Sequence, residues 1–269
     1  MKFHPHFQPI IKTDTGEVHG HESLFRLHGM LGFPLQLFTA WEARGDVAMI
    51  DALFVRCLVR MGEAGQLPPR LVGVNASART IANNSRGYFK ALEALQRHVP
   101  RLVVELTETY PVEDVGQLAE FSRQCRNAGI NFGLDDCSPG HQFAERTFIE
   151  TIQPRFIKTD LSLIRRAASG DLRPLMEVLD VAKACDLLTV VEGIDDDDKL
   201  QIVRESGSKF WQGFLGGMPA PFHMRAASGE QQTVMTVTTL PQEARSAVVQ
   251  FPQKLPLEMP TVACRLEAV

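Results

Sequence analysis

The 269-residue sequence has no excess of basic residues, since its formal net charge at pH 7 is −4. Proteins that bind nucleic-acid polymers or membrane surfaces normally carry more positive than negative charge. We therefore expect neither a DNA nor an RNA polymer as a partner. A small phosphate ligand is compatible with this balance if local cations or a bound metal offset its charge.

The sequence also lacks any apolar run long enough to cross a bilayer, and its start, MKFHPHFQPI, lacks the basic and apolar regions of a signal peptide. The five cysteines are scattered, odd in number and without a C-x-x-C spacing. That pattern is typical of reduced thiols and not of a disulfide framework or a zinc site. Together these absences predict a cytoplasmic protein without a membrane segment.

Short apolar runs alternate with helix-length amphipathic segments from about residue 70 to residue 218. The runs are rich in β-branched or aromatic side chains and lack polar alternation, as parallel strands buried on both faces do. They are LVGVNA, LVVELTE, INFGLDD, RFIKTD, LLTVVEG and KFWQGF. Upstream, FQPII and EVHGHESLF indicate two further strands around the turn TDTGE. About eight strands with interleaved helices predict an α/β fold of the TIM-like (β/α)8 barrel type.

Several helices have readable ends. Residues 46–64 have the pattern of a largely buried helix that ends at Gly65. Asp114 is a helix-capping residue at the start of an amphipathic segment that Gly129 terminates. Asp171 is expected to open another helix.

The periodic pattern stops after Phe222. We therefore divide the chain into a barrel domain, residues 1–224, and a C-terminal extension, residues 225–269. The extension lacks sustained periodicity and is expected to be a weakly structured tail or a segment docked on the barrel.

Nearly every apolar run ends in a side chain that can bind metal or phosphate. The C-terminal ends of parallel strands meet at one mouth of a barrel, so these side chains should converge there. Each one alone is more often a turn or capping residue, and the evidence lies in their recurrence. Crowded carboxylates repel one another, a conflict that Mg²⁺ or Mn²⁺ resolves with oxygen ligands. The residues are Glu22, Asn75, Glu105, Asp135, Asp136, Lys158, Glu192 and Gln212.

The chain also resembles a known family. FQPII followed by TGEVHGHESLFR is similar to the opening of EAL domains, in which a Glu-Ala-Leu triplet follows a strand. VNASAR, ELTET, LDD, IKTD, VVEGI and WQGF resemble the remaining family motifs in order and at similar spacing. The resemblance covers about residues 3 to 222, and the combination is highly specific. The expected fold is thus a TIM-like (β/α)8 barrel that is modified at the first strands.

The resemblance implies a metal-dependent phosphodiesterase that hydrolyses cyclic di-GMP to linear pGpG. It implies a two-metal site that holds Mg²⁺ or Mn²⁺. Glu22, Asn75, Glu105 and Asp135 would hold one metal, and Asp135 and Asp136 would share or hold the second.

Further roles follow from the same resemblance. Lys158 and Glu192 would position and activate the attacking water, and Glu22 and Asp195 would join the catalytic residues. Arg26 and Gln212 would contact the nucleotide.

The sequence departs from the family in the loop after the paired aspartates, where DDCSPG replaces DDFGTG. Ser138 and Pro139 remove backbone freedom from a loop that organises metal and dimer contacts in the family, and Glu108 would brace a neighbouring loop. Asp195 stands where the family has a glutamate. The resemblance thus implies a homodimer, and the altered loop predicts reduced activity.

Two alternatives stay open at this point. One is a degenerate EAL domain that acts as a non-hydrolytic cyclic di-GMP receptor or a protein-interaction module. The other is an unrelated metal-dependent barrel hydrolase or lyase, against which the order of the motifs argues.

Overall fold

The buried apolar runs form strands that close into a barrel. The computed structural model describes residues 3–28 and 35–222, and in these ranges the strands form one closed ring in the order β1 to β8. The strands are β1 (Phe3–Lys12), β2 (Val18–Leu27), β3 (Leu71–Ser77), β4 (Arg101–Thr107), β5 (Asn131–Cys137), β6 (Phe156–Thr159), β7 (Leu188–Val191) and β8 (Phe210–Gln212). The expected TIM-like barrel is confirmed.

The modification lies in β1. This strand is antiparallel to both of its neighbours, β2 and β8, whereas every pair from β2–β3 to β7–β8 is parallel. A short turn joins β1 to β2, which dictates an antiparallel pair. Gly16 has a φ of 70° in this turn, a left-handed conformation that favours glycine. The hairpin register sets Gln8 opposite Glu22, and Ile10 pairs with Gln212 where β1 meets β8.

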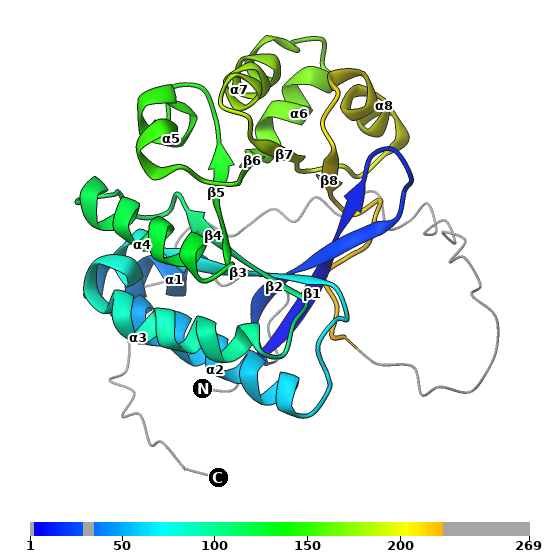
Figure 1. Ribbon diagram of the computed structural model, residues 1–269. Coiled ribbons are helices and arrows are strands. Elements are labelled where there is room, and N and C mark those ends of the chain that lie inside the picture. The colour runs from blue at the N-terminus through cyan, green and yellow to red at the C-terminus, as the bar shows by residue number, and fades with distance from the viewer. Residues whose placement is uncertain (1–2, 29–34, 223–269) are drawn as a thin grey trace, which may run out of the picture. The chain divides into compact units, whose positions relative to one another are not determined.

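Helices surround the ring of strands (Figure 1). They are α1 (Leu35–Arg44), α2 (Val47–Glu63), α3 (Ala78–Gln96), α4 (Val115–Asn127), α5 (Arg146–Ile152), α6 (Leu161–Ala168), α7 (Arg173–Ala184) and α8 (Asp197–Ser206), with a short 3-10 turn, η1 (Gln142–Ala144), before α5. None of the helices in the described ranges has the length and apolarity to cross a bilayer.

Most of the predicted helix ends match the structure. Helix α2 buries Val55 and Leu58 completely and is followed by Gly65, as the pattern of residues 46–64 predicts. Asp114 caps α4, because its Oδ1 accepts a hydrogen bond from the backbone N–H of Gln117 at 2.9 Å.

The prediction for Asp171 is wrong. Helix α7 begins at Arg173, its capping residue is Leu172, and no side chain caps it. The Asp171 carboxylate is instead paired with Arg166 of the preceding helix, at 2.5 Å. Asp171 follows a turn at Gly170, where φ is 95°, so it closes the connection between α6 and α7.

Side chains inside the barrel form two layers. Alternate residues of a strand face the same side, so Val103 and Glu105 both point inward from β4, and Phe156 and Lys158 do so from β6. The layer near the N-terminal ends of the strands is apolar and includes Val103 and Phe156, whose ring fills the space that a side chain at Gly133 would need. The layer near the C-terminal ends is polar.

The predicted division at residue 224 is not tested by the structure. Residues 223–269 lie outside the described residues, so the expected tail stays a prediction.

Candidate metal centre

Lys158 lies among four carboxylates, three of them on other strands of the barrel and one directly after a strand. Its Nζ atom lies 3.2 Å from Glu22 Oε2, 3.0 Å from Glu105 Oε2, 3.0 Å from Asp135 Oδ1 and 2.6 Å from Glu192 Oε1. Glu22, Glu105 and Asp135 belong to β2, β4 and β5, and Glu192 follows the last residue of β7. The structure thus brings together five side chains that the sequence analysis expects at one mouth.

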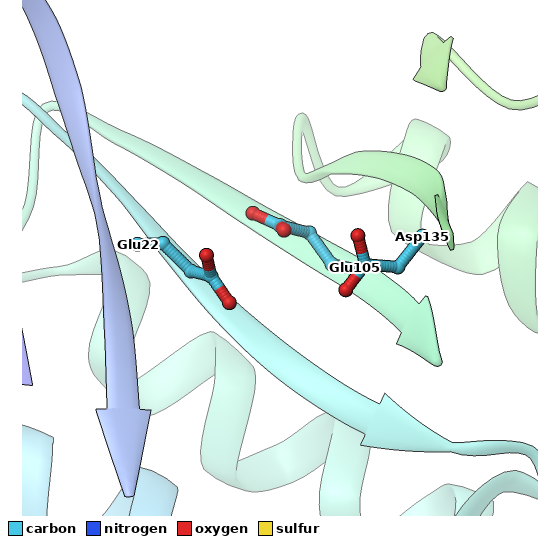
Figure 2. Close-up of side chains that lie close together, drawn as sticks. All are labelled: Glu22, Glu105 and Asp135. Carbon is cyan, nitrogen blue, oxygen red and sulfur yellow. The ribbon is translucent and has the colours of Figure 1, made fainter. Parts of the chain in front are cut away.

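Three of these carboxylates face a common space, as Figure 2 shows for Glu22, Glu105 and Asp135. One ligand oxygen from each lies within 4.8 Å of the others. Asp135, Asp136 and Glu192 form a second group under the same limit. Because Asp135 belongs to both groups, the arrangement fits two cations that share one carboxylate.

The negative charge of this cluster exceeds its positive charge. A lysine ammonium has three N–H donors, and Lys158 faces four carboxylates. The side chains of Lys158, Glu22 and Glu105 are 1%, 6% and 1% exposed. Water therefore has little access to the carboxylate charge that Lys158 leaves unbalanced. Ionised carboxylates buried in this way need further cations or protons.

The pKa of each carboxylate reflects this competition. Burial, opposed by Lys158, leaves the pKa of Glu105 and of Glu192 well above the ordinary value. Burial alone would also raise the pKa of Glu22, but Lys158 and two neutral hydrogen-bond donors bring it below its ordinary value. Glu22 is therefore the carboxylate of this group that the protein holds most firmly in its ionised form.

Glu22 owes its hydrogen bonds to two amides. Asn75 Nδ2 donates to Glu22 Oε1 at 2.8 Å, and Gln212 Nε2 donates to Glu22 Oε2 at 2.8 Å. Gln212 also contacts Gln8 Oε1 at 3.3 Å. The sequence analysis did not predict Gln8 as part of the site. Its amide is the one polar side chain of the apolar run FQPII, and this feature could have indicated a role in the site.

Asp136 has an unusual backbone. Its φ is 50°, in the left-handed region that aspartate tolerates better than most residues. Burial, the charge of Asp135 and that of Glu108 raise the pKa of Asp136 to about 8. Burial raises the pKa of Glu108, which the charge of Asp135 raises further, so Glu108 lies close to the paired aspartates.

The residues fit a hard divalent cation. All donors of the two groups are carboxylate oxygens, which Mg²⁺ and Mn²⁺ prefer. The buried Oδ1 of Asn75 has no hydrogen-bond partner in the described part of the chain, and it belongs to the amide that contacts Glu22. Gly73 leaves the space that the Glu105 carboxylate occupies, because a Cβ there would overlap Glu105 Oε1.

Arg26 and Asp195 lie differently. Arg26 is half-buried, and its Nη1 donates to the carbonyl of Phe25 at 2.8 Å. The Asp195 side chain is 49% exposed and forms an ion pair with Lys199, four residues along the chain. Asp195 thus makes none of the contacts to Lys158 that unite the other predicted catalytic residues, and its role stays a prediction.

The altered loop is packed against the core. Cys137 is fully buried, with its Sγ 3.7 Å from the carbonyl of Phe143. Phe143 is itself fully buried between His141 and Phe148, with ring centroids 4.7 Å and 5.5 Å away. The segment after Ser138 is therefore held by an aromatic anchor.

A model of the EAL domain matches residues 1–219. The chain belongs to the EAL-domain family. Among curated relatives, the cyclic di-GMP phosphodiesterase NbdA of Pseudomonas aeruginosa is 27% identical over 80% of this chain, and the cyclic di-GMP phosphodiesterase PdeL of Escherichia coli is 25% identical over 82%. The alignments cover 29% and 63% of those two proteins, so this EAL chain spans less than two thirds of either.

Solved EAL structures share the fold. The c-di-GMP complex of the PaMucR phosphodiesterase matches with a TM-score of 0.69 and 24% identity, over 81% of this chain and 92% of that one. The manganese and cyclic di-GMP complex of Klebsiella pneumoniae BlrP1 matches with a TM-score of 0.65 and 19% identity, over 82% and 56%.

Proposed function

We propose that this EAL domain is a phosphodiesterase that uses Mg²⁺ or Mn²⁺ to hydrolyse cyclic di-GMP to linear pGpG. The observation that carries the proposal is the pair of carboxylate groups, one buried and one partly buried, that share Asp135. The two curated relatives named above are cyclic di-GMP phosphodiesterases, and the BlrP1 structure contains manganese with cyclic di-GMP. These findings support the same substrate and the same class of cofactor.

Glu22, Asn75, Glu105 and Asp135 would hold one cation, and Asp135 and Asp136 the second. When bound, such cations stabilise the negative charge that develops on the phosphate and on the leaving oxygen. The hydrogen bonds from Asn75 and Gln212 keep Glu22 ionised and aim its carboxylate at the space that it shares with Glu105 and Asp135.

Glu192 and Lys158 are the proposed catalytic pair. Of the four carboxylates that contact Lys158, Glu192 is the most exposed, at 17% compared with 1% for Glu105. Its raised pKa suits a group that takes a proton from the attacking water. Lys158 would add positive charge beside the phosphate in the transition state.

The substrate contacts remain part of the proposal. Arg26 would pair with a phosphate of the nucleotide, and Gln212 would orient both Glu22 and the substrate. Glu108 would brace the loop after the paired aspartates, since it lies close enough to Asp136 for the charge of Glu108 to raise the pKa of Asp136. The homodimer implied by the family resemblance is a further proposal.

Hydrolysis of cyclic di-GMP by purified protein with Mg²⁺ or Mn²⁺ tests the proposal. Glu22→Gln keeps the shape of the side chain but removes its charge, and it should reduce the rate about a thousandfold or more. Glu93→Gln changes an exposed glutamate of α3 and should leave the rate unchanged. Wild type that binds the nucleotide but turns it over no faster than Glu22→Gln would disprove the enzyme proposal.

One observation favours the alternative of a non-hydrolytic receptor. Pro139 and the buried Phe143 anchor restrict the loop after the paired aspartates. The double variant Ser138→Gly, Pro139→Thr separates the two functions, because it changes no metal ligand. An enzyme limited by this loop should gain kcat in the variant, whereas a receptor should show no turnover in either form.

A further inference from the structure

A cavity of about 530 Å³ opens at the end of the barrel opposite to the metal centre. Its position follows from its lining, because it includes the first residue of six consecutive strands. These residues are Leu71 of β3, Arg101 of β4, Asn131 of β5, Phe156 of β6, Leu188 of β7 and Phe210 of β8. The corresponding face of a (β/α)8 barrel usually serves stability alone.

The inner wall of this cavity is apolar. Ile10, Val103, Phe156 and Val190 line it and form a buried cluster of their own. Val103 and Phe156 each precede a residue of the metal centre by two positions, so this apolar layer lies next to the polar layer of the metal centre. Glu105, which is 1% exposed, is the acidic residue that lines the cavity at this inner end.

The rim is cationic. Arg101 and Arg155 line the cavity and are exposed, and neither forms an ion pair with an acid of residues 3–28 or 35–222. His19 lies between rim and wall, with its ring 4.4 Å from that of Phe210. Burial lowers the pKa of His19, and Arg101 lowers it further. The positive field at the rim therefore comes from the arginines and not from the histidine.

The surroundings keep this charge uncompensated. Lys12 and Arg70 also lower the pKa of His19. Lys12 is paired with Glu17 at 3.0 Å, and Arg70 donates to a backbone carbonyl. Asp14 belongs to the lining of an adjoining pocket and not to that of this cavity.

We propose that this cavity binds a small organic anion, a carboxylate with an aromatic or aliphatic body. The carboxylate pairs with Arg101 and Arg155, whose guanidinium groups match a carboxylate in two parallel hydrogen bonds. The apolar body packs against Phe156, Val190 and Phe210. The volume lies in the range of small-molecule sites, and the exposed Arg101 and Arg155 carry the positive charge at the rim, so the ligand binds with its anionic end outward.

Calorimetric titration of the full chain with 2-naphthoate tests the proposal. EDTA is present so that the carboxylate of 2-naphthoate cannot bind through a metal ion. Neutral 2-naphthamide, which has the same ring system without the charge, is the matched probe. We expect saturable binding of 2-naphthoate that Arg101→Gln with Arg155→Gln weakens at least about tenfold, since two charge-assisted contacts are lost. Arg86→Gln, at an exposed arginine of α3, should bind like wild type.

A second variant tests the apolar wall without changing charge. Leu188→Trp places a large ring in the cavity and should abolish binding of both probes, while the circular dichroism spectrum and melting temperature confirm the fold. Binding of 2-naphthoate that the arginine double variant leaves as tight as in wild type, or that persists in Leu188→Trp, overturns the proposal. No saturable binding to the full chain overturns it too, including the case in which another part of the chain fills the cavity.

Discussion

Replacing Lys158 with methionine measures the electrostatics of the metal centre directly. Methionine keeps an unbranched, apolar side chain and removes the ammonium that contacts four carboxylates at 2.6 to 3.2 Å. Loss of one partner of a buried ion pair typically costs about 3–5 kcal/mol, because the other charge stays buried. Since four carboxylates lose the same partner, we expect the upper end, about 5 kcal/mol, at pH 8 without metal.

The loss should depend on pH in a defined direction. Lys158 lowers the pKa of Glu105, Asp135 and Glu192, whose values are raised by burial nonetheless. Without Lys158 these pKa values rise further. A carboxyl group whose pKa is raised by folding favours the folded state at low pH and loses that contribution as pH rises toward the folded pKa. The variant should therefore approach wild type as pH falls from 8 to 5.

Urea unfolding followed by circular dichroism, at pH 5 and pH 8 in EDTA, gives both numbers. Lys90→Met changes an exposed lysine of α3 and should stay within about 0.5 kcal/mol of wild type at both pH values. Equal stability of Lys158→Met and wild type at pH 8 would refute the reasoning. A deficit that is the same at both pH values would refute the assignment to ionised carboxylates.

Three further changes have defined outcomes. Burial raises the pKa of Asp51 from 3.8 to about 7, so wild type should lose up to roughly 4 kcal/mol of stability as pH rises from 4 to 7. Asp51→Asn cannot ionise and should not show this loss in thermal unfolding. Gly73→Ala should displace the Glu105 carboxylate and weaken Mn²⁺ binding about tenfold in calorimetry. Asp114→Ala removes the α4 cap and should cost about 1 kcal/mol in urea unfolding.

The strands of the barrel were accessible from the sequence for a physical reason. Strands covered on both faces must be apolar throughout, so runs such as LVGVNA and LVVELTE stand out from the amphipathic helices. The functional site of a (β/α)8 barrel lies at the C-terminal ends of its strands, so the polar last residues of these runs were predicted to form the metal site.

Long-range features were not accessible in the same way. The closure of the barrel depends on antiparallel pairing of β1 with β8, between residues about 200 positions apart. The central position of Lys158 depends on carboxylates that distant parts of the chain bring together. The cavity at the other end of the barrel depends on the Phe156 ring, which occupies the space that a side chain at Gly133 would need. A local reading also misplaced Asp171, because its partner Arg166 lies in the preceding helix.

Asp195 offers the sharpest test of motif against geometry. The family resemblance makes it catalytic, whereas the structure pairs its half-exposed carboxylate with Lys199. An exposed ion pair of this kind contributes at most about 1 kcal/mol, and it contributes this to stability and not to the barrier of the reaction. Asp195→Ala should therefore slow hydrolysis of cyclic di-GMP less than tenfold, while Glu192→Ala, which removes the proposed proton acceptor beside Lys158, should slow it a hundredfold or more, roughly the range for general base catalysis. Lys199→Ala should behave like Asp195→Ala if the pair acts only through stability. Equal losses for Asp195→Ala and Glu192→Ala, with Lys199→Ala unaffected, would instead support the catalytic role that the family resemblance implies for Asp195.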